Sequence, residues 1–346
     1  YRSSSIIFIF TSLIMIIILT ILSHFSYSAY TFYFANFCFI ICVVALNIVS
    51  EYLLCLTTQK ESKESGSTKN NFPIYFGPRG LGSLIGNFFG GRILENHPSS
   101  FVFFITSFIP ILILFLAMIH QEPKFGSSPP EKRPIREELK VLRNLLSKSE
   151  LLLLVTCIGL INICPNFDSI TNYYLTESMS FSTNDLADLS TISAAFYILG
   201  LIFYYRWLLG VSAKKLFLFS NVLLWFGNVS FMALVLHWVQ AWGINPKIFC
   251  LANYGIYSFI AELNMMPVFA IWTAHVPPGL EATSITLFTG IINLTSNIGN
   301  YTGTAVSWMI GVSSKNIERL WLALFVQNIY LILVVVAIFF IPFKEP

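Results

Sequence analysis

A few ionisable side chains lie inside long, mostly apolar stretches of the chain: Glu51, Arg79, Asp168 and Glu262. A charge at membrane depth is costly, so such residues usually mark a substrate pathway or a proton relay. The planar guanidinium of Arg79 suits a substrate carboxylate, which it can hold through two parallel hydrogen bonds. The alternative for Arg79 is a permanent structural pair with Glu51. Asp168 and Glu262 are the candidates for a proton carrier.

Uncharged polar residues recur on three of the apolar stretches, at spacings that place them along helix faces. They are Asn162, Asn166, Ser169 and Tyr173 on the first, Asn253, Tyr254, Tyr257 and Asn264 on the second, and Thr286, Asn293, Asn297 and Asn300 on the third. A single buried asparagine often only cross-links helices. Three polar stripes near charges of both signs favour a hydrated central cavity that takes a flat, hydrogen-bonding substrate with a carboxylate.

The sequence around Arg79 is rich in glycine. Gly82, Gly86 and Gly90 follow it at i, i+4 and i+8 spacing, which predicts a small-residue face for close packing by a neighbouring helix. Such packing would hold Arg79 toward the interior.

These residues require membrane-spanning helices to position them. Of the 346 residues, 55% are hydrophobic and 11% are charged, with a mean hydropathy of +0.72. A soluble domain usually has about 25% charged residues, so a cytosolic enzyme, a disordered chain and a nucleic-acid binder are excluded. Stretches of roughly 20 apolar residues can span a bilayer as helices. We predict ten such spans, at 5–22, 30–56, 74–94, 101–119, 151–175, 188–205, 216–236, 248–274, 283–311 and 320–343.

The loops between the spans predict an orientation and a division of the chain. Most lysines and arginines fall in alternate loops, which places both termini in the cytoplasm under the positive-inside rule. We expect a partial N-terminal bundle of four spans (1–120), a cytoplasmic inter-bundle loop (121–150) and a C-terminal bundle of six spans (151–346). Within the loop, Ile135, Leu139 and Leu142 suit either a surface amphipathic helix or a solvated linker. The uneven division suggests that two spans are missing from the front.

Other kinds of site have no sequence support. The cysteines lack the paired spacing of a disulfide framework or zinc site, and the histidines show no metal-ligand spacing. No phosphate-binding glycine loop or nucleophile motif occurs. We therefore expect no enzyme activity, no catalytic residues, no cofactor and no metal.

Three segments carry a family resemblance. FPIYFGPRGLGSLIGNFFGGRILE (72–95) resembles the glycine-rich, arginine-bearing fifth helix of the folate–biopterin transporter family, a branch of the major facilitator superfamily. MPVFAIWTAHVPPGLEATSITLFTGIINL (266–294) resembles its tenth-to-eleventh helix junction, and NICPNFDSITNYYLTESMSFS (162–182) its seventh helix and following loop. YRSSS resembles the end of the basic loop after helix 2. The resemblance implies an all-α membrane protein with a major facilitator-type helical bundle, of which this chain carries helices 3–12 of twelve.

The resemblance implies transport of folates or pterins by alternating access, which we expect to be proton-coupled. Arg79, Asp168, Glu281 and Asn293 match the family pattern, whereas the family's usual acidic pair on helix 4 is reduced here to Glu51. The predicted substrate-binding residues are Arg79, Asn162, Asn166, Asp168, Tyr173, Tyr254, Tyr257 and Asn293. The predicted proton-coupling or gating residues are Glu51, Asp168, Glu262 and Glu281, the last at a cytoplasmic turn as a gate or helix cap.

Two rival functions remain open at this point. One is a transporter of another small organic anion or metabolite on the same fold, and the other is a non-transporting binding or receptor protein derived from a truncated transporter. The expected partners are a small-molecule substrate, protons and the lipid bilayer, with no nucleic acid, and the chain is expected to act as a monomer. The expected location is the plasma membrane, with an organellar membrane as the alternative.

Overall fold

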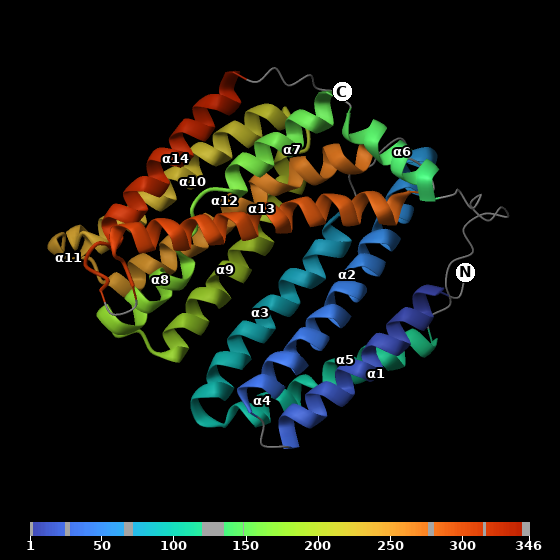
Figure 1. Ribbon diagram of the computed structural model, residues 1–346, viewed down its shortest axis with the longest axis horizontal. Coiled ribbons are helices and arrows are strands. Elements are labelled where there is room, and N and C mark those ends of the chain that lie inside the picture. Colours follow the sequence, from blue (N-terminus) through green and yellow to red (C-terminus); the bar gives the residue numbers. More distant parts are fainter. Residues whose placement is uncertain are drawn as a thin grey trace.

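The computed structural model describes residues 3–24, 28–65, 72–119, 135–147, 149–275, 280–313 and 316–340, which are almost entirely helical (Figure 1). The helices are α1 (Ser3–His24), α2 (Ala29–Ser65), α3 (Phe72–Asn96), α4 (Ser99–Thr106), α5 (Phe108–Ile119), α6 (Ile135–Leu146), α7 (Ser149–Asn162), α8 (Asp168–Tyr173), α9 (Thr183–Phe203), α10 (Ala213–Val235), α11 (Trp238–Ala241), α12 (Pro246–His275), α13 (Glu281–Ile310) and α14 (Leu320–Phe340), with π-helical segments η1 (Tyr174–Ser178) and η2 (Tyr204–Leu208).

Each of the ten predicted spans falls on one helix or on consecutive helices. Within the described ranges, seven segments are long and apolar enough to cross a membrane. The other predicted spans correspond to α3, α7 with α8, and α13, whose glycine, proline and asparagine residues make them less apolar. The structure therefore has the helical, multi-pass character that the sequence predicted, and the count of ten stays a prediction.

The fifth predicted span is interrupted. The prediction of one continuous helix over 151–175 is wrong, because α7 ends at Asn162 and α8 begins at Asp168, with Pro165 between them. Proline lacks a backbone N–H and disrupts a helix. At membrane depth, backbone groups freed by a break need partners inside the protein. Here α13 supplies them, since the Asn166 N–H donates to the Gly299 carbonyl (3.0 Å) and the Thr302 hydroxyl to the Ile163 carbonyl (3.2 Å).

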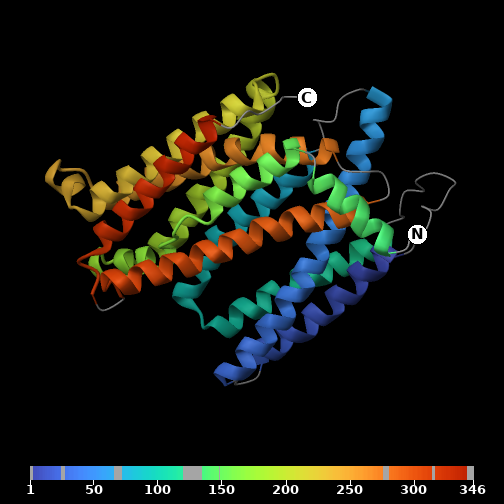
Figure 2. The ribbon, with the colours of Figure 1, turned by 45° about the horizontal axis from the view of Figure 1, so that its top comes forward.

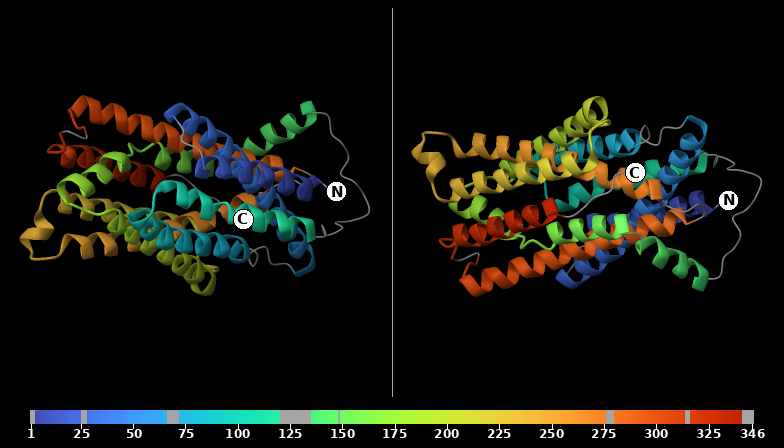
Figure 3. Two further views of the ribbon diagram at one scale, coloured as in Figure 1. Left: turned by 90° about the horizontal axis from the view of Figure 1, so that it is seen from below. Right: turned by 90° about the horizontal axis from the view of Figure 1, so that it is seen from above.

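The helices form two groups, which we call the N-terminal half (α1–α5) and the C-terminal half (α7–α14). In the N-terminal half, α1 packs against α2, α4 and α5. The halves meet along two helix pairs, α3 with α9 and α2 with α13. Figures 2 and 3 show the blue-to-teal N-terminal helices lying alongside the green-to-red C-terminal helices. These four helices therefore form the main contacts between the halves.

The contact between α3 and α9 depends on two glycines. A Cβ atom at Gly80 would lie 2.8 Å from a side-chain carbon of Ile198, and one at Gly91 would overlap the Ala187 side chain. Glycine is needed where backbones approach this closely. The predicted packing face on Gly82, Gly86 and Gly90 is wrong, because no neighbouring atom among the described residues lies within 4 Å of a Cβ placed there. Arg79 is therefore positioned by the adjacent Gly80 contact.

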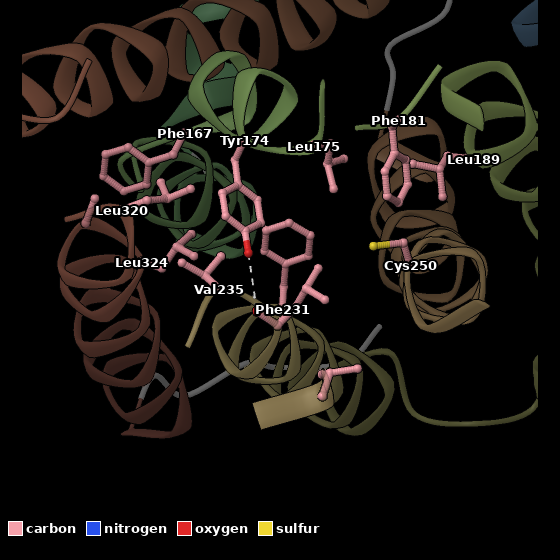
Figure 4. Close-up of a cluster of buried hydrophobic side chains, with 13 residues drawn as sticks. Phe167, Tyr174, Leu175, Phe181, Leu189, Phe231, Val235, Cys250, Leu320 and Leu324 are labelled. Carbon is pink, nitrogen blue, oxygen red and sulfur yellow. Dashed lines mark hydrogen bonds between the residues drawn. The ribbon is translucent and has the colours of Figure 1, made fainter. Parts of the chain in front are cut away.

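Buried apolar clusters lie mainly in the C-terminal half. One cluster, drawn in Figure 4, joins α8, η1, α9, α10, α12 and α14 through side chains that include Phe167, Leu175, Phe231 and Leu324. The Tyr174 hydroxyl within it donates to the Leu234 carbonyl (3.3 Å). A second cluster packs α7 against α10, α12, α13 and α14 around Trp272, which stacks on Phe288 at 4.5 Å between ring centroids. These clusters hold the cavity-lining helices in fixed register.

The loop between the halves contains a helix. Residues Ile135–Leu146 form α6, which contacts α7 and lies at the end of the molecule where α1 begins (Figures 1 and 2). The helix is strongly amphipathic. Its placement on a membrane surface stays a prediction, and the rest of the predicted loop, residues 121–134 and Lys148, lies outside the described residues.

Candidate functional site

A cavity of about 840 Å³ lies between the two halves, bounded by α2, α3, α9, α12 and α13. Ligand pockets commonly have volumes of about 300–1,000 Å³. Its polar and charged lining side chains come from both halves: Asn47, Glu51, Arg79, Ser83 and Asn87 from the N-terminal half, and Ser190, Ser193, Tyr197, Tyr254, Ser258, Glu262, Thr286, Thr289 and Asn293 from the C-terminal half. We call this space the central cavity.

Among the described residues that line the central cavity, Arg79 is the only one with a cationic side chain. Neither a hydrogen bond nor an ion pair within 4 Å holds its guanidinium among the residues that the structure describes. Its charge nevertheless acts on two carboxylates, Glu51 on α2 and Glu262 on α12. The permanent Arg79–Glu51 pair considered from the sequence is therefore not formed here. The guanidinium is available to an anion in the cavity.

Two buried carboxylates face Arg79 from opposite halves. Glu51 is 9% exposed and accepts a long hydrogen bond from the Thr289 hydroxyl on α13 (3.4 Å). Glu262 is 5% exposed and is hydrogen-bonded to Tyr197 on α9. The Oε1 atom of Glu262 has no hydrogen-bond partner within the described part of the chain. A buried polar atom without a partner is costly, so this oxygen marks a position for a proton, a water molecule or a ligand group.

A smaller cavity of about 330 Å³ lies wholly within the C-terminal half. It is lined by α10, α12, α13, α14 and the break between α7 and α8. Half of its polar lining residues are carboxamides: the lining contains Asn162, Asn166, Asp168, Thr171, Asn221, Trp225, Asn228, Asn253, Tyr254, Tyr257, Ser296 and Gln327. We call it the amide cavity. Tyr254 lines both cavities, so its side chain lies where they adjoin.

The α7–α8 break arranges the first of these polar groups. The Asn166 carbonyl oxygen Oδ1 accepts from the Asp168 backbone N–H (2.7 Å), and its Nδ2 donates to the Asp168 carboxylate (3.0 Å). Asn162 donates to the Thr295 hydroxyl on α13 at 3.4 Å. Asp168 is exposed and held by Asn166, whereas Glu262 is buried with one free oxygen. The two candidate proton carriers therefore stand in different surroundings.

The residues predicted from the sequence divide between the two cavities. Those in the central cavity are Glu51, Arg79, Glu262 and Asn293, those in the amide cavity are Asn162, Asn166, Asp168 and Tyr257, and Tyr254 lines both. Tyr173 lines neither cavity and is 49% exposed. The break before α8 explains this, because it removes Tyr173 from the helix face that carries Asn162. Glu281 begins α13, and its side chain lies outside the described residues.

Several lining residues were not identified from the sequence. They include Tyr197, Ser193 and Ser258 in the central cavity, and Asn221, Trp225 and Gln327 in the amide cavity. Asn221 and Asn228, seven residues apart on α10, repeat the spacing used to identify the other stripes, so this signal was present. No group of three or more potential metal ligands occurs among the residues searched in the described ranges.

Comparisons with known proteins extend over most of the chain. The model of the BT1 family matches residues 6–346. The chain is 22% identical over 301 residues to the folate-biopterin transporter of Synechocystis sp., which covers 87% of this chain and 60% of that protein. It is 21% identical over 305 residues to folate transporter 2 of Plasmodium falciparum, covering 88% of this chain and 66% of that protein. The chain thus spans about 60–66% of the length of these relatives.

A solved structure shares the fold. The chain superimposes on a POT family peptide transporter, described as auto inhibited, with a TM-score of 0.62 and 13% sequence identity, covering 97% of this chain and 81% of that chain. At this identity the likeness concerns the fold alone. The predicted all-α membrane fold of the major facilitator type is confirmed.

Proposed function

Because the chain belongs to the BT1 family, as its motifs predicted, we propose that it is the main part of a membrane transporter for folates or related pterins. The Synechocystis and Plasmodium relatives are named as folate or folate-biopterin transporters. These names agree with the prediction that the chain is not an enzyme. The proposed substrate joins a flat heterocycle to carboxylates, and the two cavities offer matching groups.

The observation that carries this proposal is the unpaired Arg79 guanidinium in the central cavity. A guanidinium in a cavity wall can bind a carboxylate through two charge-assisted hydrogen bonds. The opposing Glu51 and Glu262 side chains place two carboxyl groups near the one guanidinium. An incoming carboxylate competes with them for Arg79, so binding at this residue affects groups on both halves.

We propose alternating access because the central cavity lies between the two halves. The central cavity has walls from both halves, so a rocking motion of one half against the other would open it to either side of the membrane. We propose Glu262 as the proton carrier, because it is buried and has one unpartnered oxygen. Asp168 is held by Asn166 at an exposed position and contributes to substrate binding instead. Glu51 and Glu281 are proposed as gating residues.

The proposal also covers the domain organisation, orientation, location and oligomeric state of the protein. We propose that residues 1–120 and 151–346 move as two bundles joined by the loop at 121–150. Both termini face the cytoplasm, the plasma membrane holds the protein, and it works as a monomer. Reaction of single cysteines placed at either end of α1 with a membrane-impermeant thiol reagent measures the orientation.

Uptake of radiolabelled folate by the full-length protein in a folate-auxotrophic host tests the proposal. Losing one partner of a buried charge pair costs about 2–5 kcal/mol, so Arg79→Ala should reduce folate uptake at least tenfold at equal surface expression. Arg206→Ala is the matched control, because Arg206 is exposed and lines neither cavity. Normal folate uptake by Arg79→Ala would overturn the anion site.

Competition distinguishes the proposal from its closest rival. The Arg79 cavity has the chemistry to accept organic anions in general, so a transporter of another small anion is the second candidate. Unlabelled folate and biopterin should both reduce labelled folate uptake, whereas amino acids and nucleosides should not. Inhibition only by unrelated anions would favour the rival. Binding of folate without any uptake would favour a receptor.

A further inference from the structure

The amide cavity is a distinct chamber, and binding of an anion at Arg79 does not account for its polar lining. Every residue that lines it lies between Ile161 and Val335, so it belongs entirely to the C-terminal half. Its lining contains five asparagines, one glutamine and a single charged group, Asp168, and no lysine, arginine or histidine. An anion would therefore meet a carboxylate and no compensating cation. The chamber selects a neutral or cationic guest.

The hydrogen bonds of the amides show which of their atoms remain available. A backbone carbonyl can only accept, so an amide that bonds to one must present its NH₂ group there and its oxygen elsewhere. Three amides of α10 and α12 do so: Asn221 to the Phe217 carbonyl (2.7 Å), Asn228 to that of Leu224 (3.1 Å) and Asn253 to that of Gly227 (3.1 Å).

The oxygen atoms left over make the chamber rich in hydrogen-bond acceptors. No described residue donates to Oδ1 of Asn162, Asn221 or Asn253, whereas the Asn228 side chain is hydrogen-bonded to Tyr257. Asn221 is only 5% exposed, yet none of these oxygens is among the fully enclosed side-chain atoms that lack a hydrogen-bond partner, so each can be reached from the chamber. An acceptor that opens into a chamber can take a hydrogen bond from water or from a ligand that supplies donors. The chamber therefore fits a guest with several N–H groups on one edge.

The remaining walls are apolar or aromatic. Phe167, Phe231, Tyr254 and Trp225 line the chamber, and the Trp225 indole N–H is already used by the Asn328 carbonyl (3.1 Å). The rings of Phe167, Phe231 and Trp225 therefore offer stacking rather than further donors, and Tyr254 adds a hydroxyl group. A volume of about 330 Å³ is at the lower end for ligand pockets, which suits one fused ring system and excludes a whole folate.

The chamber adjoins the central cavity at Tyr254, so each cavity can bind a different end of one substrate. Carboxylates fit the central cavity at Arg79, and an aminopyrimidine ring, with N–H donors on its edge, fits the amide cavity. A ring compound without carboxylates has a partner only in the amide cavity. Binding of such a compound should not depend on Arg79.

This inference rests on the proposed function. We propose that Asn221, Asn253 and Trp225 make the amide cavity a separate binding site for the neutral, aminopyrimidine-containing ring. Biopterin, which has no carboxylate, binds in this site alone. Folate binds across both cavities, with its linker passing Tyr254.

Equilibrium binding to the purified full-length protein tests this with three probes: biopterin, folate and the p-aminobenzoylglutamate tail. Arg79→Ala should weaken folate and tail binding at least tenfold and change biopterin binding less than twofold. The double variant Asn221→Ala with Asn253→Ala should weaken biopterin and folate binding about tenfold, since each lost hydrogen bond removes a few-fold, and leave the tail unaffected. Asn264→Ala is the matched control, because Asn264 is a buried asparagine of α12 outside both cavities that bonds to Ser220.

A second measurement does not depend on how well the amide variant folds. Trp225 is the only tryptophan in the lining of either cavity. Biopterin should therefore quench part of the tryptophan fluorescence of the unaltered protein and of Asn264→Ala, and Trp225→Phe should lose that part.

The outcomes separate this inference from the proposed function. If Arg79→Ala weakens biopterin and folate equally, or if quenching persists in Trp225→Phe, the separate ring site is overturned. If folate binds and biopterin does not, the ring site is overturned and the anion site stands. If neither folate nor biopterin binds the unaltered protein, the proposed function fails and this inference fails with it.

Discussion

The two halves of the molecule contribute different chemistry to the site. The N-terminal half supplies Arg79 and Glu51, whereas the C-terminal half supplies Glu262 and the carboxamides of the amide cavity. Their packing differs as well. The N-terminal helices expose many large apolar side chains, including Phe10, Phe34 and Ile85, while the buried clusters around Trp272 and Tyr174 belong to the C-terminal half.

The two halves differ because an amide and a charged group need different partners at membrane depth. An amide can satisfy its donors within its own helix, as Asn221 does with Phe217, so it can be housed inside one packed half. A charge needs an opposite charge or a ligand nearby. Arg79 and Glu262 come from opposite halves and meet only across the central cavity. The charged side chains therefore interact across the boundary between the halves, whereas the amide side chains line a cavity within the C-terminal half.

The largest expected effect concerns the close packing of the C-terminal half. A Cβ atom at Gly303 of α13 would overlap the Asn166 carbonyl in the α7–α8 break. Backbone cannot move aside there as a flexible side chain can, so Gly303→Val should cost more than about 4 kcal/mol and largely abolish folded protein. The matched variant Gly86→Val, in the open part of α3, should change stability by less than about 1 kcal/mol.

Fluorescence-detected size-exclusion chromatography after heating measures both glycine variants. Equal thermal stability of Gly303→Val and the unaltered protein would show that α13 does not seal the break. A large loss in Gly86→Val would show that the face of α3 carrying Gly82, Gly86 and Gly90 is packed after all.

A smaller effect is expected where the halves meet. Gly91 lies against Ala187 of α9, whereas a Cβ placed on its neighbour Gly90 would have no described atom within 4 Å. Gly91→Val should therefore cost about 1–3 kcal/mol through overpacking. Gly90→Val is a control one residue away and should be close to neutral. The same melting assay decides, and equal effects of the two variants would contradict the α3–α9 packing.

The contrast between these glycines also shows how far the sequence predicts the structure. Apolar stretches were enough to predict the helices, because membrane depth restricts the backbone to helices. The major facilitator-type class was implied by the resemblance of three segments to a known family. The i, i+4, i+8 glycine pattern pointed to the wrong face of α3. Spacing shows which residues share a face, but the neighbour that covers this face depends on tertiary packing.

The site was predictable to the extent that it depends on residue type. Arg79, Glu51, Glu262 and Asn293 all line the central cavity, because ionisable and polar residues at membrane depth avoid lipid. Tyr173 was misplaced, since its stripe assumed an unbroken helix. The division into two cavities was not predictable, because it depends on how α10 and α14 pack against the break.

The next prediction asks which half carries the coupling acid. Glu262 and Glu51 are both buried carboxylates affected by Arg79. However, Glu262 has a fully enclosed oxygen without a hydrogen-bond partner among the described residues, whereas Glu51 accepts a hydrogen bond from Thr289. In proton-coupled uptake the rate rises as external pH falls. We expect Glu262→Gln to lose this pH response and to reduce uptake at pH 6 about tenfold, equivalent to about 1.4 kcal/mol.

Glu51→Gln is the matched variant from the other half. It should keep the pH response and lower the rate two- to threefold, as expected for a gating residue. Initial rates of folate uptake between pH 5.5 and 8 measure both variants. A preserved pH response in Glu262→Gln, with loss in Glu51→Gln, would assign coupling to the N-terminal half.

The smallest expected effect concerns the polar contacts that join the halves at the end of α3. Arg92 forms an ion pair with Asp188 on α9 (3.3 Å) and lies over the Phe88 ring at 3.8 Å, and Glu95 bonds to Asn184 close by. Both members of the ion pair are nearly half exposed, so it should stabilise by only about 0.2–1 kcal/mol. Such a weak contact is suited to a joint that opens in the proposed transport cycle.

A double-mutant cycle separates this pair from its surroundings. Arg92→Asp and Asp188→Arg should each lower the melting temperature slightly, and the double variant should recover most of the loss because the opposite charges are restored. The recovery should shrink at high salt, since exposed pairs are screened. Losses that simply add in the double variant would mean that the Arg92–Asp188 pair does not help to hold the two halves together here, which leaves the Gly91 packing and the Glu95–Asn184 bond. The link between the halves would then depend on shape rather than charge.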